Sequence, residues 1–518
     1  MSLAGRALPP GIDAQTHHDF FDELSTIVGE VNISRDGTSG ALEGPHQQTS
    51  YGDPFPLDDA GNHVPSGGVR PASVAELQEV LKTANRLKIP LWTVSRGRNL
   101  GYGGTAPVVK GSVVLDLHRM NKIIEINQEY SYAIVEPGVS FFDLFNEIKQ
   151  RDLALWPSCP AIGWGSIIGN TLDRGFGYTP AGMGAMKDSS LFALFKGGYG
   201  PSVDGLFYQS NLGVVTKIGI HLTPAPESYM GIAVSVPEEE DLVALVGTLS
   251  ALQRQNIITN SPSISNAFRQ ALVSDLPSVR SKLIPYCGPN KCVPEDVLRT
   301  IGKEQGWGFW KAEFGLYGSV ETVPALFKTL ERAFESIKGA KIESKYAPGV
   351  AGKFLRASEL APESIPHTGI PTLEPLHMMD YRKPGSGHVS FSPLIPPSGR
   401  EIYEWYLTAK KRTADASFDF FADFHVYPHH VIAIDLLVFA QEEAGRVDDL
   451  YRVLLEDAQQ LGYSEYRTHV RYMDAVGQHF DFNDGALGRF VGRLKDTLDP
   501  NGILASGKSS IWGSKKVT

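Results

Sequence analysis

A glycine-rich segment is the part of the sequence whose residue types most directly suggest chemistry. Residues 95–104 read Ser-Arg-Gly-Arg-Asn-Leu-Gly-Tyr-Gly-Gly and come directly after a short apolar run that we predict to be a strand. Glycine at 97, 101, 103 and 104 lets successive backbone N–H groups turn inward, forming a nest for an anion such as a pyrophosphate. The spacing fits neither a Rossmann nor a Walker fingerprint. From spacing alone, a phosphate nest and a plain glycine-rich turn are equally open.

Composition limits the classes of function. The chain has 518 residues, and 48 Lys and Arg against 58 Asp and Glu give a net charge of -10. This balance argues against general binding of nucleic acid or anionic membrane, because the summed field repels both. The length predicts two or three domains. Three cysteines, at 159, 287 and 292, are too few for a disulfide framework and lack zinc spacing, so we expect free thiols and no metal site.

The sequence gives no sign of targeting or membrane insertion. Residues 1–15 contain Pro9 and Pro10 and no apolar stretch typical of a secretory signal. No apolar run approaches the length of a membrane span. The C-terminal residues 513–518 match neither a peroxisomal address nor a lipidation motif. We therefore expect a soluble, cytoplasmic protein.

The elements that must position the loop indicate an α+β architecture. Ser73 and Glu76 form a predicted capping box before an amphipathic helix that ends ahead of Pro90. Further helices are expected at residues 17–27, 141–150, 240–253, 323–337 and 487–498, and strands at 91–95, 112–117, 132–136, 230–236 and 418–425. The expected organisation is an arm (1–65), an α+β domain (66–225), a second α+β domain (226–460) and a C-terminal return (461–518).

Further motifs, in the same order along the chain, carry a family resemblance. They are the segments 111–116 (Gly-Ser-Val-Val-Leu-Asp), 135–138 (Val-Glu-Pro-Gly), 163–175 (Gly-Trp-Gly-Ser-Ile-Ile-Gly-Asn-Thr-Leu-Asp-Arg-Gly), 209–217 (Gln-Ser-Asn-Leu-Gly-Val-Val-Thr-Lys) and 499–502 (Asp-Pro-Asn-Gly). Together with the glycine loop, they resemble the vanillyl-alcohol oxidase/para-cresol methylhydroxylase family of flavoproteins, and especially its 4-phenol oxidase branch. The resemblance runs from about Pro65 to Trp512. It implies a two-domain flavoprotein, in which a PCMH-type FAD-binding domain is covered by a cap (substrate) domain.

The resemblance also implies which residues hold FAD. His388, in the segment Gly-Ser-Gly-His-Val-Ser-Phe-Ser-Pro, matches the histidine that is covalently joined to the flavin 8α-methyl group; from the residues alone it is a histidine ending a glycine-rich turn. Lys508 resembles a lysine that contacts the flavin, the alternative being a solvated tail lysine. The other cofactor-binding residues that the resemblance implies are Gly97, Arg98, Asn99, Leu100, Gly101, Gly103, Gly104, Gly165, Ser166 and Asn170.

Three residues match the family's site for the phenol oxygen, namely Tyr102, Tyr466 and Arg467. A guanidinium and two phenolic hydroxyls around one oxygen favour the ionised phenol. Ionisation prepares the para carbon to lose hydride to flavin N5 and leaves a quinone methide, to which water can add. Taken singly, Tyr102 could equally be a surface turn residue, and Tyr466 and Arg467 a strand edge.

The chain departs from the family pattern at the usual acid/base. Where the family commonly has an aspartate beside flavin N5, this chain has Ala161, in the run Pro-Ala-Ile-Gly-Trp-Gly-Ser at 160–166. Asp423, in the strand predicted at 418–425, is expected to line the substrate pocket and to supply the missing acid from another side. The alternative is an aspartate on a surface-facing strand position.

A second departure concerns length. After Pro180 the family continues with a Gly-Asp-His turn and a strand hairpin, whereas this chain passes directly to Ala-Gly-Met-Gly-Ala at 181–185. Relative to the family pattern, about twenty residues, enough for two strands and a turn, are therefore missing. Either the sheet is trimmed or the sequence lacks a segment that a working enzyme has.

These observations give a main functional hypothesis and two alternatives. The main one is an FAD-dependent 4-phenol oxidase acting on phenols of the vanillyl alcohol, eugenol or 4-alkylphenol type, with molecular oxygen as acceptor and peroxide as product. The alternatives are a cytochrome-linked phenol dehydrogenase or hydroxylase, and a catalytically impaired flavin-binding protein. The expected partners are a small phenol and oxygen, with no nucleic acid or membrane, and a homo-oligomer is possible.

Overall fold

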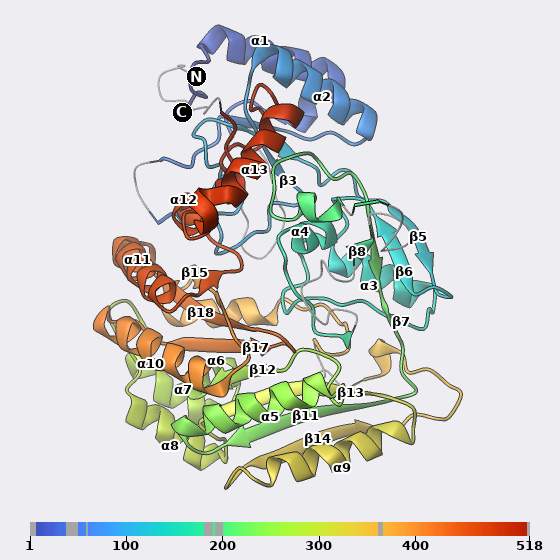
Figure 1. Cartoon of the computed structure of the whole chain (residues 1–518), viewed down its shortest axis with the longest axis vertical. Coiled ribbons are helices and arrows are strands. Elements are labelled where there is room, and N and C mark those ends of the chain that lie inside the picture. Colours follow the sequence, from blue (N-terminus) through green and yellow to red (C-terminus); the bar gives the residue numbers. More distant parts are fainter. Residues whose placement is uncertain are drawn as a thin grey trace.

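The computed structural model describes residues 7–37, 50–57, 61–180, 190–191, 200–201, 203–360 and 366–514. The segment after Pro180, where the sequence suggested a missing hairpin, lies largely outside the described residues. Within the described part, no helix is long and apolar enough to cross a membrane. The architecture mixes helices and sheets in two parts, as expected (Figure 1).

The first part begins with a small sheet ordered β1-β2-β4-β3. Its strands are β1 (Ile33–Ser34), β2 (Gly67–Val69), β3 (Leu91–Val94) and β4 (Val113–Asp116). Strand β4 runs parallel to β2 and β3, and helices α1 (Ala14–Val28) and α2 (Val74–Leu87) pack on the sheet. Ser73 accepts the N–H of Glu76 as predicted, but the Glu76 carboxylate accepts the N–H of Ala72 rather than that of Ser73.

A second antiparallel sheet in this part is ordered β5-β6-β9-β8. Its strands are β5 (Ile123–Asn127), β6 (Tyr132–Val135), β8 (Ser190–Leu191) and β9 (Ile218–His221), and β7 (Leu155–Trp156) pairs separately with β10 (Thr223–Pro224). Helices α3 (Phe141–Gln150) and α4 (Ile167–Leu172) bury their apolar side chains against this sheet. The glycine-rich loop leaves the first sheet at Val94, and α4 begins beside the second, so both meet at one cavity.

The second part is built on a large sheet ordered β14-β11-β13-β12-β17-β18-β16-β19, with β15 also paired to β18. Its strands are β11 (Ser228–Val236), β12 (Ser263–Asn266), β13 (Trp310–Gly318), β14 (Lys341–Ala347), β15 (Gly387–Phe391), β16 (Pro393–Ile395), β17 (Phe421–Val426), β18 (Val431–Phe439) and β19 (Ser464–Glu465). One face is covered by α5 (Leu242–Arg254), α9 (Thr322–Phe334), α10 (Gly399–Asp415) and α11 (Ala444–Gln460), as Figure 1 shows.

Strand periodicity decides what the other face of this sheet does. Along β17, Ala422, Phe424 and Val426 belong to the core under the helices. Because side chains alternate between the two faces of a strand, Phe421, Asp423 and His425 lie on the opposite face. That face looks toward the first part of the chain and lines the cavity. This face of the large sheet therefore forms one wall of the cavity, and we call it the roof.

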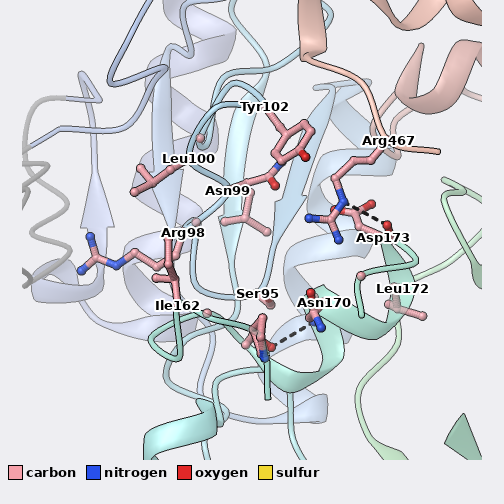
Figure 2. Close-up of a pocket in the computed structure, with 18 of the residues that line it drawn as sticks. Ser95, Arg98, Asn99, Leu100, Tyr102, Ile162, Asn170, Leu172, Asp173 and Arg467 are labelled. Carbon is pink, nitrogen blue, oxygen red and sulfur yellow. Dashed lines mark hydrogen bonds between the residues drawn. The ribbon is translucent and has the colours of Figure 1, made fainter. Parts of the chain in front are cut away.

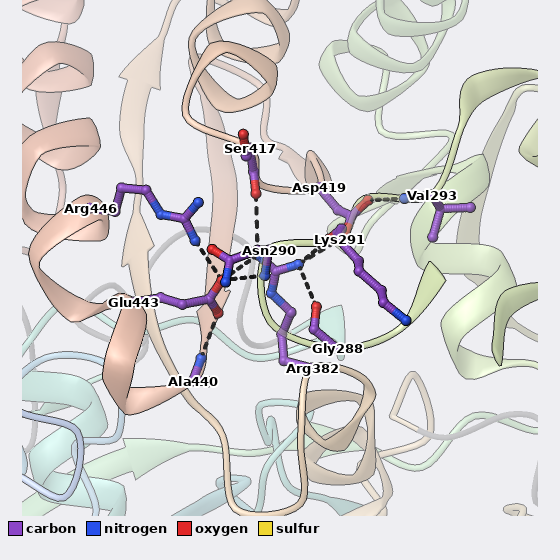
Figure 3. A network of polar contacts seen from close by, with 10 residues as sticks. All are labelled: Gly288, Asn290, Lys291, Val293, Arg382, Ser417, Asp419, Ala440, Glu443 and Arg446. Carbon is purple, nitrogen blue, oxygen red and sulfur yellow. Dashed lines mark hydrogen bonds and ion pairs between the residues drawn. The ribbon is translucent and has the colours of Figure 1, made fainter. Parts of the chain in front are cut away.

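A buried polar network anchors the roof at its outer end (Figure 3). The Arg382 guanidinium is fully buried and lies 3.2 Å from a Glu443 carboxylate oxygen and 3.7 Å from one of Asp419. It also donates to the carbonyls of Gly288 and Ser417. Helices α6 (Ala267–Val273), α7 (Pro277–Leu283) and α8 (Glu295–Gln305) pack in this region. Arg382 thus joins the chain just before β15 to the start of β17.

The C-terminal segment returns to the first part. This segment contains helices α12 (Met473–Gly477) and α13 (Phe482–Leu498), drawn in red in Figure 1. Helix α13 is interrupted by left-handed residues at 483–485, so its regular part agrees with the helix predicted from residue 487. Ile503 enters the core under α1 and α2, and Leu504 pairs in parallel with Leu91. Residues more than 400 positions apart therefore share one core.

Candidate functional site

One cavity of about 410 Å³ lies between the roof and the first part of the chain. Its size is typical of a site for a small molecule or cofactor. It collects every site residue predicted from the sequence except Gly101 and Gly103, which lie just behind its wall. The predicted residues that line it are Gly97, Arg98, Asn99, Leu100, Tyr102, Gly104, Gly165, Ser166, Asn170, His388, Asp423, Tyr466, Arg467 and Lys508.

The glycine-rich loop forms the cradle at one wall of this cavity (Figure 2). Gly97, Gly101, Gly103 and Gly104 all have positive φ, between 56° and 101°. This is the left-handed region that only glycine adopts without strain, which explains the composition of the loop. The N–H groups of Tyr102 and Gly104 both reach the carbonyl of Asn99. The loop is therefore a compact turn held by its own backbone.

Electrostatics make this wall suitable for an anion. The Arg98 guanidinium lies 4.5 Å from the ring centroid of Trp164. Burial, together with the nearby Arg96, lowers the pKa of Arg98 to about 10. Burial and the like charge both disfavour the charged guanidinium, so a negative charge placed beside Arg98 would stabilise it. Arg98 and the glycine backbone, which both line the cavity, thus fit the pyrophosphate of a dinucleotide.

The three residues predicted to bind a phenol oxygen lie together. The Arg467 guanidinium carbon is 5.1 Å from the ring centroid of Tyr102 and 5.6 Å from that of Tyr466. Figure 2 shows Tyr102 and Arg467 facing the same space. Arg467 Nε donates to the carbonyl of Asp173 at 3.0 Å, whereas its buried Nη2 has no hydrogen-bond partner among the described residues. A buried N–H without a partner is costly and is satisfied by a ligand oxygen.

Burial keeps the hydroxyl of Tyr466 protonated. Burial and the neighbouring Tyr102 raise the pKa of Tyr466 well above its usual value, although Arg467 acts in the opposite direction. A protonated hydroxyl is a hydrogen-bond donor. Lys508 Nζ lies 2.9 Å from Asp173 Oδ1, which keeps the pKa of Asp173 lowered despite burial. Lys508 therefore holds the residue that orients Arg467.

His388 lies on β15, opposite Val438 of β18, and faces the cavity. A Cβ added to Gly101 would lie 2.7 Å from both Cδ2 and Nε2 of His388, so the imidazole occupies the space that this glycine leaves free. The ring of Phe55 lies 6.0 Å away. The roof thus presents the imidazole next to the glycine loop.

Asp423 lies in the cavity wall, as predicted, and Ala161 lines the cavity without an acid. Ser263 Oγ donates to Asp423 Oδ1 at 2.6 Å, and Arg269 Nη2 lies 3.3 Å from Oδ2. Burial by itself would raise the pKa of Asp423, but the charges of Arg269 and His425 outweigh it and hold the pKa well below its usual range. Asp423 is therefore ionised at neutral pH.

Two polar residues of this wall, Arg269 and His425, were not singled out from the sequence. His425 is two residues after Asp423 on one strand, so period-two alternation could have placed both on the same face. Arg269 lies on α6, and no local pattern indicates that it faces Asp423. The contact joins residues more than 150 positions apart.

Comparisons with known proteins show the family to which this chain belongs. Residues 65–193 match a family model described as an FAD binding domain. The chain is 33% identical, over 97% of both chains, to the 4-cresol dehydrogenase [hydroxylating] flavoprotein subunit of Pseudomonas putida. It is similar to the solved structure of 4-ethylphenol oxidase from Gulosibacter chungangensis in complex with isoeugenol, with a TM-score of 0.88, 29% identity and 98% and 99% of the two chains covered.

A second solved structure, p-cresol methylhydroxylase with substrate bound, matches with a TM-score of 0.85 at 28% identity and covers 98% of this chain and 99% of that one. These likenesses extend over almost the full length of both partners, so they include the roof as well as the cofactor-binding part. The chain therefore belongs to the vanillyl-alcohol oxidase/para-cresol methylhydroxylase family of flavoproteins, and is an FAD-linked oxidoreductase with the two-domain fold of that family.

Proposed function

We propose that this chain oxidises para-substituted phenols at the benzylic carbon of the para substituent, with FAD as the cofactor. The observation that carries the proposal is that Tyr102, Tyr466 and Arg467 line the same cavity as the glycine-rich loop. Within this trio, the buried Nη2 of Arg467 has no hydrogen-bond partner among the described residues. The names of the relatives support it, since 4-cresol and 4-ethylphenol are both para-substituted phenols.

The proposed mechanism starts with ionisation of the phenol. Arg467 and the hydroxyls of Tyr102 and Tyr466 surround the phenol oxygen and lower its pKa. The electron pair of the phenolate then favours departure of a hydride from the benzylic carbon, which leaves a quinone methide. Bound FAD supplies the acceptor for this hydride. Water then adds to the methide: its O–H group bonds to the benzylic carbon and its other proton goes to the ring oxygen, which restores the aromatic phenol. The one proton released overall is the one that the phenol lost on ionisation.

We further propose that His388 binds the flavin covalently through its 8α-methyl group. The position of its imidazole against Gly101, at the edge of the glycine cradle, supports this. Gly97, Arg98, Asn99, Leu100 and Gly104 would hold the pyrophosphate side, while Gly103, at positive φ behind them, would shape the loop. Gly165, Ser166, Asn170 and Lys508 would hold the rest of the cofactor.

We propose that Asp423 acts on the added water, because Ala161 stands where the family commonly has an aspartate. Because its carboxylate stays ionised, it accepts a hydrogen bond from that water and orients the oxygen toward the methide. If Asp423→Asn leaves both turnover and product stereochemistry unchanged while Tyr466→Phe lowers turnover, this role is wrong.

Oxygen is the proposed electron acceptor. The competing acceptor is a cytochrome, which the resemblance to a protein named as a flavoprotein subunit favours. Hydrogen peroxide formed in proportion to oxidised 4-ethylphenol supports the oxidase. Turnover only with an artificial electron acceptor supports the dehydrogenase.

The test of the whole proposal begins with the colour of the purified protein. A flavin absorbance band, and yellow colour that remains in the acid-precipitated pellet, are expected for a covalent flavoprotein. Colourless protein that neither takes up FAD nor oxidises 4-ethylphenol contradicts the enzyme. Yellow colour only in the supernatant contradicts the His388 attachment and leaves the rest of the proposal standing.

A further inference from the structure

Two cysteines at the outer end of the roof take no part in the mechanism above. Cys287 and Cys292 are free, half-buried thiols, whereas Cys159 is fully buried. They bound the loop 287–292, which lies between α7 and α8, and no residue of this loop lines the cavity. The conformation of the loop decides what the two thiols can do together.

The loop is a closed turn. Its central residues are a proline and Asn290, and the N–H of Lys291 donates to the carbonyl of Gly288 at 3.3 Å. Asn290 has a φ of +58°, and a proline followed by a residue of positive φ is typical of a type II turn. The end residues of such a turn have Cα atoms within about 7 Å of each other. Cys287 and Cys292 therefore stand directly outside the two ends of one tight turn.

Arg382 holds both ends of this turn (Figure 3). One of its guanidinium nitrogens, Nη1, donates to the carbonyl of Gly288 at 3.3 Å and also to that of Lys291. These two carbonyls belong to the residues next to the cysteines. Because one donor atom reaches both carbonyls, the two ends of the turn lie close together. The buried ion pairs of Arg382 keep that donor in place.

The two thiols also share their polar neighbours. Burial raises the pKa of Cys287 and of Cys292, and the carboxylate of Asp419 adds to this in both cases. The charge of Arg382 acts on both thiols in the opposite direction. Both side chains thus turn toward one polar cluster. Disulfide-bonded cysteines have Cα atoms about 4.4–6.8 Å apart, a separation that the two sides of a tight turn supply.

One of the two thiols is better prepared to react. Arg382 lowers the pKa of Cys292 by a hydrogen bond as well as by its charge, and Arg446 adds a second positive charge. For Cys287, the second positive charge is that of Lys291. The thiolate is the reactive form of cysteine, and a hydrogen bond to the charged form favours it. Cys292 is therefore the thiol that reacts first.

We propose that Cys287 and Cys292 form a reversible disulfide, with hydrogen peroxide as the oxidant. The sulfur of Cys292 attacks one peroxide oxygen, the O–O bond breaks, and the other oxygen leaves as water with the proton of this thiol. The sulfur of Cys287 then attacks the resulting sulfenic acid, the S–O bond breaks, and a second water leaves with the proton of Cys287. The two thiols lose two electrons and the peroxide gains them.

This modification goes beyond phenol oxidation and does not depend on it, since peroxide from any source serves. The bridge would brace the cavity wall from behind. Cys287 packs against an apolar cluster that contains Met379, Phe421 and Leu436, and these three residues line the cavity. Because the cysteines themselves lie outside the cavity, bridge formation is measured directly rather than through turnover.

The test treats the reduced full-length protein with hydrogen peroxide at pH 8.5, blocks the remaining thiols with N-ethylmaleimide in urea, and identifies the tryptic peptides by mass. Trypsin cleaves after Lys291, so the two cysteines fall on different peptides unless a disulfide joins them. The expected product is the joined pair, which dithiothreitol separates, together with alkylated Cys159. Two separate alkylated or overoxidised peptides, or a bridge to Cys159 or to a second copy of the chain, overturn the proposal.

Serine variants test the order in which the two thiols react. In Cys287→Ser, the sulfenic acid formed at Cys292 has no partner and should be trapped by dimedone, whereas Cys292→Ser should give about tenfold less adduct. Cys159→Ser is the matched control and should form the bridge at the rate of the parent. Equal adducts in the first two variants contradict the order, and loss of the bridge in Cys159→Ser contradicts the pairing.

The rate of bridge formation should depend on pH. The charged and titratable groups around the two thiols are Asp419, Arg382, Lys291, Arg446 and Tyr381. Because burial and Asp419 keep both thiol pKa values above the usual value, the thiolate fraction at neutral pH is small and grows about tenfold per pH unit. We expect the loss of alkylatable thiol to be on the order of tenfold faster at pH 8 than at pH 7. A rate that does not change with pH contradicts attack by a thiolate.

Discussion

At the scale of single residues, Arg467 shows how burial and charge create a binding site. Its Nε is held by the carbonyl of Asp173, and Asp173 is held by Lys508, so the guanidinium is oriented before any ligand arrives. Arg467, whose Nη2 is unpaired among the described residues, lines the same cavity as Tyr102 and Tyr466. A preorganised set of donors stabilises a developing or bound oxyanion without having to reorganise, which is why it is effective.

Tyr466→Phe removes one donor from this set and nothing else. We expect kcat/KM for 4-ethylphenol to fall by on the order of a hundredfold, as for the loss of one donor to an oxyanion. Steady-state kinetics measure this. The matched control is Tyr463→Phe, which removes a hydroxyl bound to Glu401 outside the cavity and should change kcat/KM by less than about twofold. Equal effects of the two variants would contradict the role of Tyr466.

Glu465, the residue before Tyr466, makes stability depend on pH. Burial raises the pKa of Glu465 to about 7, although Thr468, Tyr451 and the Ser392 N–H lower it in part. The native state therefore holds a proton that the unfolded chain releases near pH 4.3, and stability decreases as the pH rises from about 4 to about 7. The loss is at most about 4 kcal/mol, from 1.36 kcal/mol per pKa unit.

Glu465→Gln should remove that pH dependence, because the amide has no proton to lose. We expect the free energy of unfolding of the variant, relative to that of the parent, to be higher at pH 8 than at pH 5. Urea unfolding at both pH values measures this difference. Glu331→Gln, at an exposed position of α9, is the control and should follow the parent. An unchanged slope in Glu465→Gln would show that the carboxyl does not titrate in this window.

At the scale of elements, the site depends on a strand and a loop meeting at close range. Strand β15 carries His388 and is paired to β18 along its length, while the glycine loop is fixed by Asn99 and by the reciprocal bonds between Gly52 and Thr105. Asp53 in the same segment pairs with His469 at 2.9 Å, two residues after Arg467. Residues 50–57 thus tie the loop to the C-terminal part of the site.

Gly101→Ala tests the contact between the loop and the strand. The added Cβ would lie 2.7 Å from the His388 ring, at a φ of +76° that disfavours alanine, so the imidazole must move. We expect loss of covalently bound flavin, measured as absorbance retained in the acid-precipitated pellet. Gly247→Ala, at an exposed helical position with nothing within 4 Å, should retain the flavin fully. Full retention in Gly101→Ala would contradict the assignment of His388.

At the scale of the whole molecule, the C-terminal tail closes the cofactor side of the cavity. Lys495 is 0% exposed and donates to the carbonyls of Asn211 and Leu504, and it lies 2.7 Å from Asp499. Asn211 in turn donates to the carbonyls of Ala505 and Ile511. This network fastens the segment that ends in Lys508 to the first part of the chain.

Lys495→Met leaves the Asp499 carboxylate buried and without its cation. Removing one partner of a buried pair costs about 3–5 kcal/mol, so we expect a clearly lower unfolding temperature and faster proteolysis of the tail. Lys383→Met is the control, because its pair with Glu442 is about half exposed and contributes at most about 1 kcal/mol. Similar losses in both variants would contradict the special role of the buried network.

The sequence predicted several elements closely, and physical reasons explain which. Helices α2 and α3 begin and end where their apolar spacing and Ser caps indicate, because these signals are local. The short strands β1, β2 and β7 were not predicted. Strands of two or three residues have no periodicity of their own and exist only through their partners, so no local pattern reveals them.

The sequence by itself determined the chemistry that is encoded locally. Glycine at 97, 101, 103 and 104 is needed by the positive φ values of the loop, and the motifs in order along the chain identified the family. Only the tertiary structure decided that Arg269 and His425 both lie against Asp423, and that Lys508 orients Arg467 through Asp173. Alternation along a strand says which residues share a face, but whether that face meets solvent, core or cavity depends on packing between segments hundreds of residues apart.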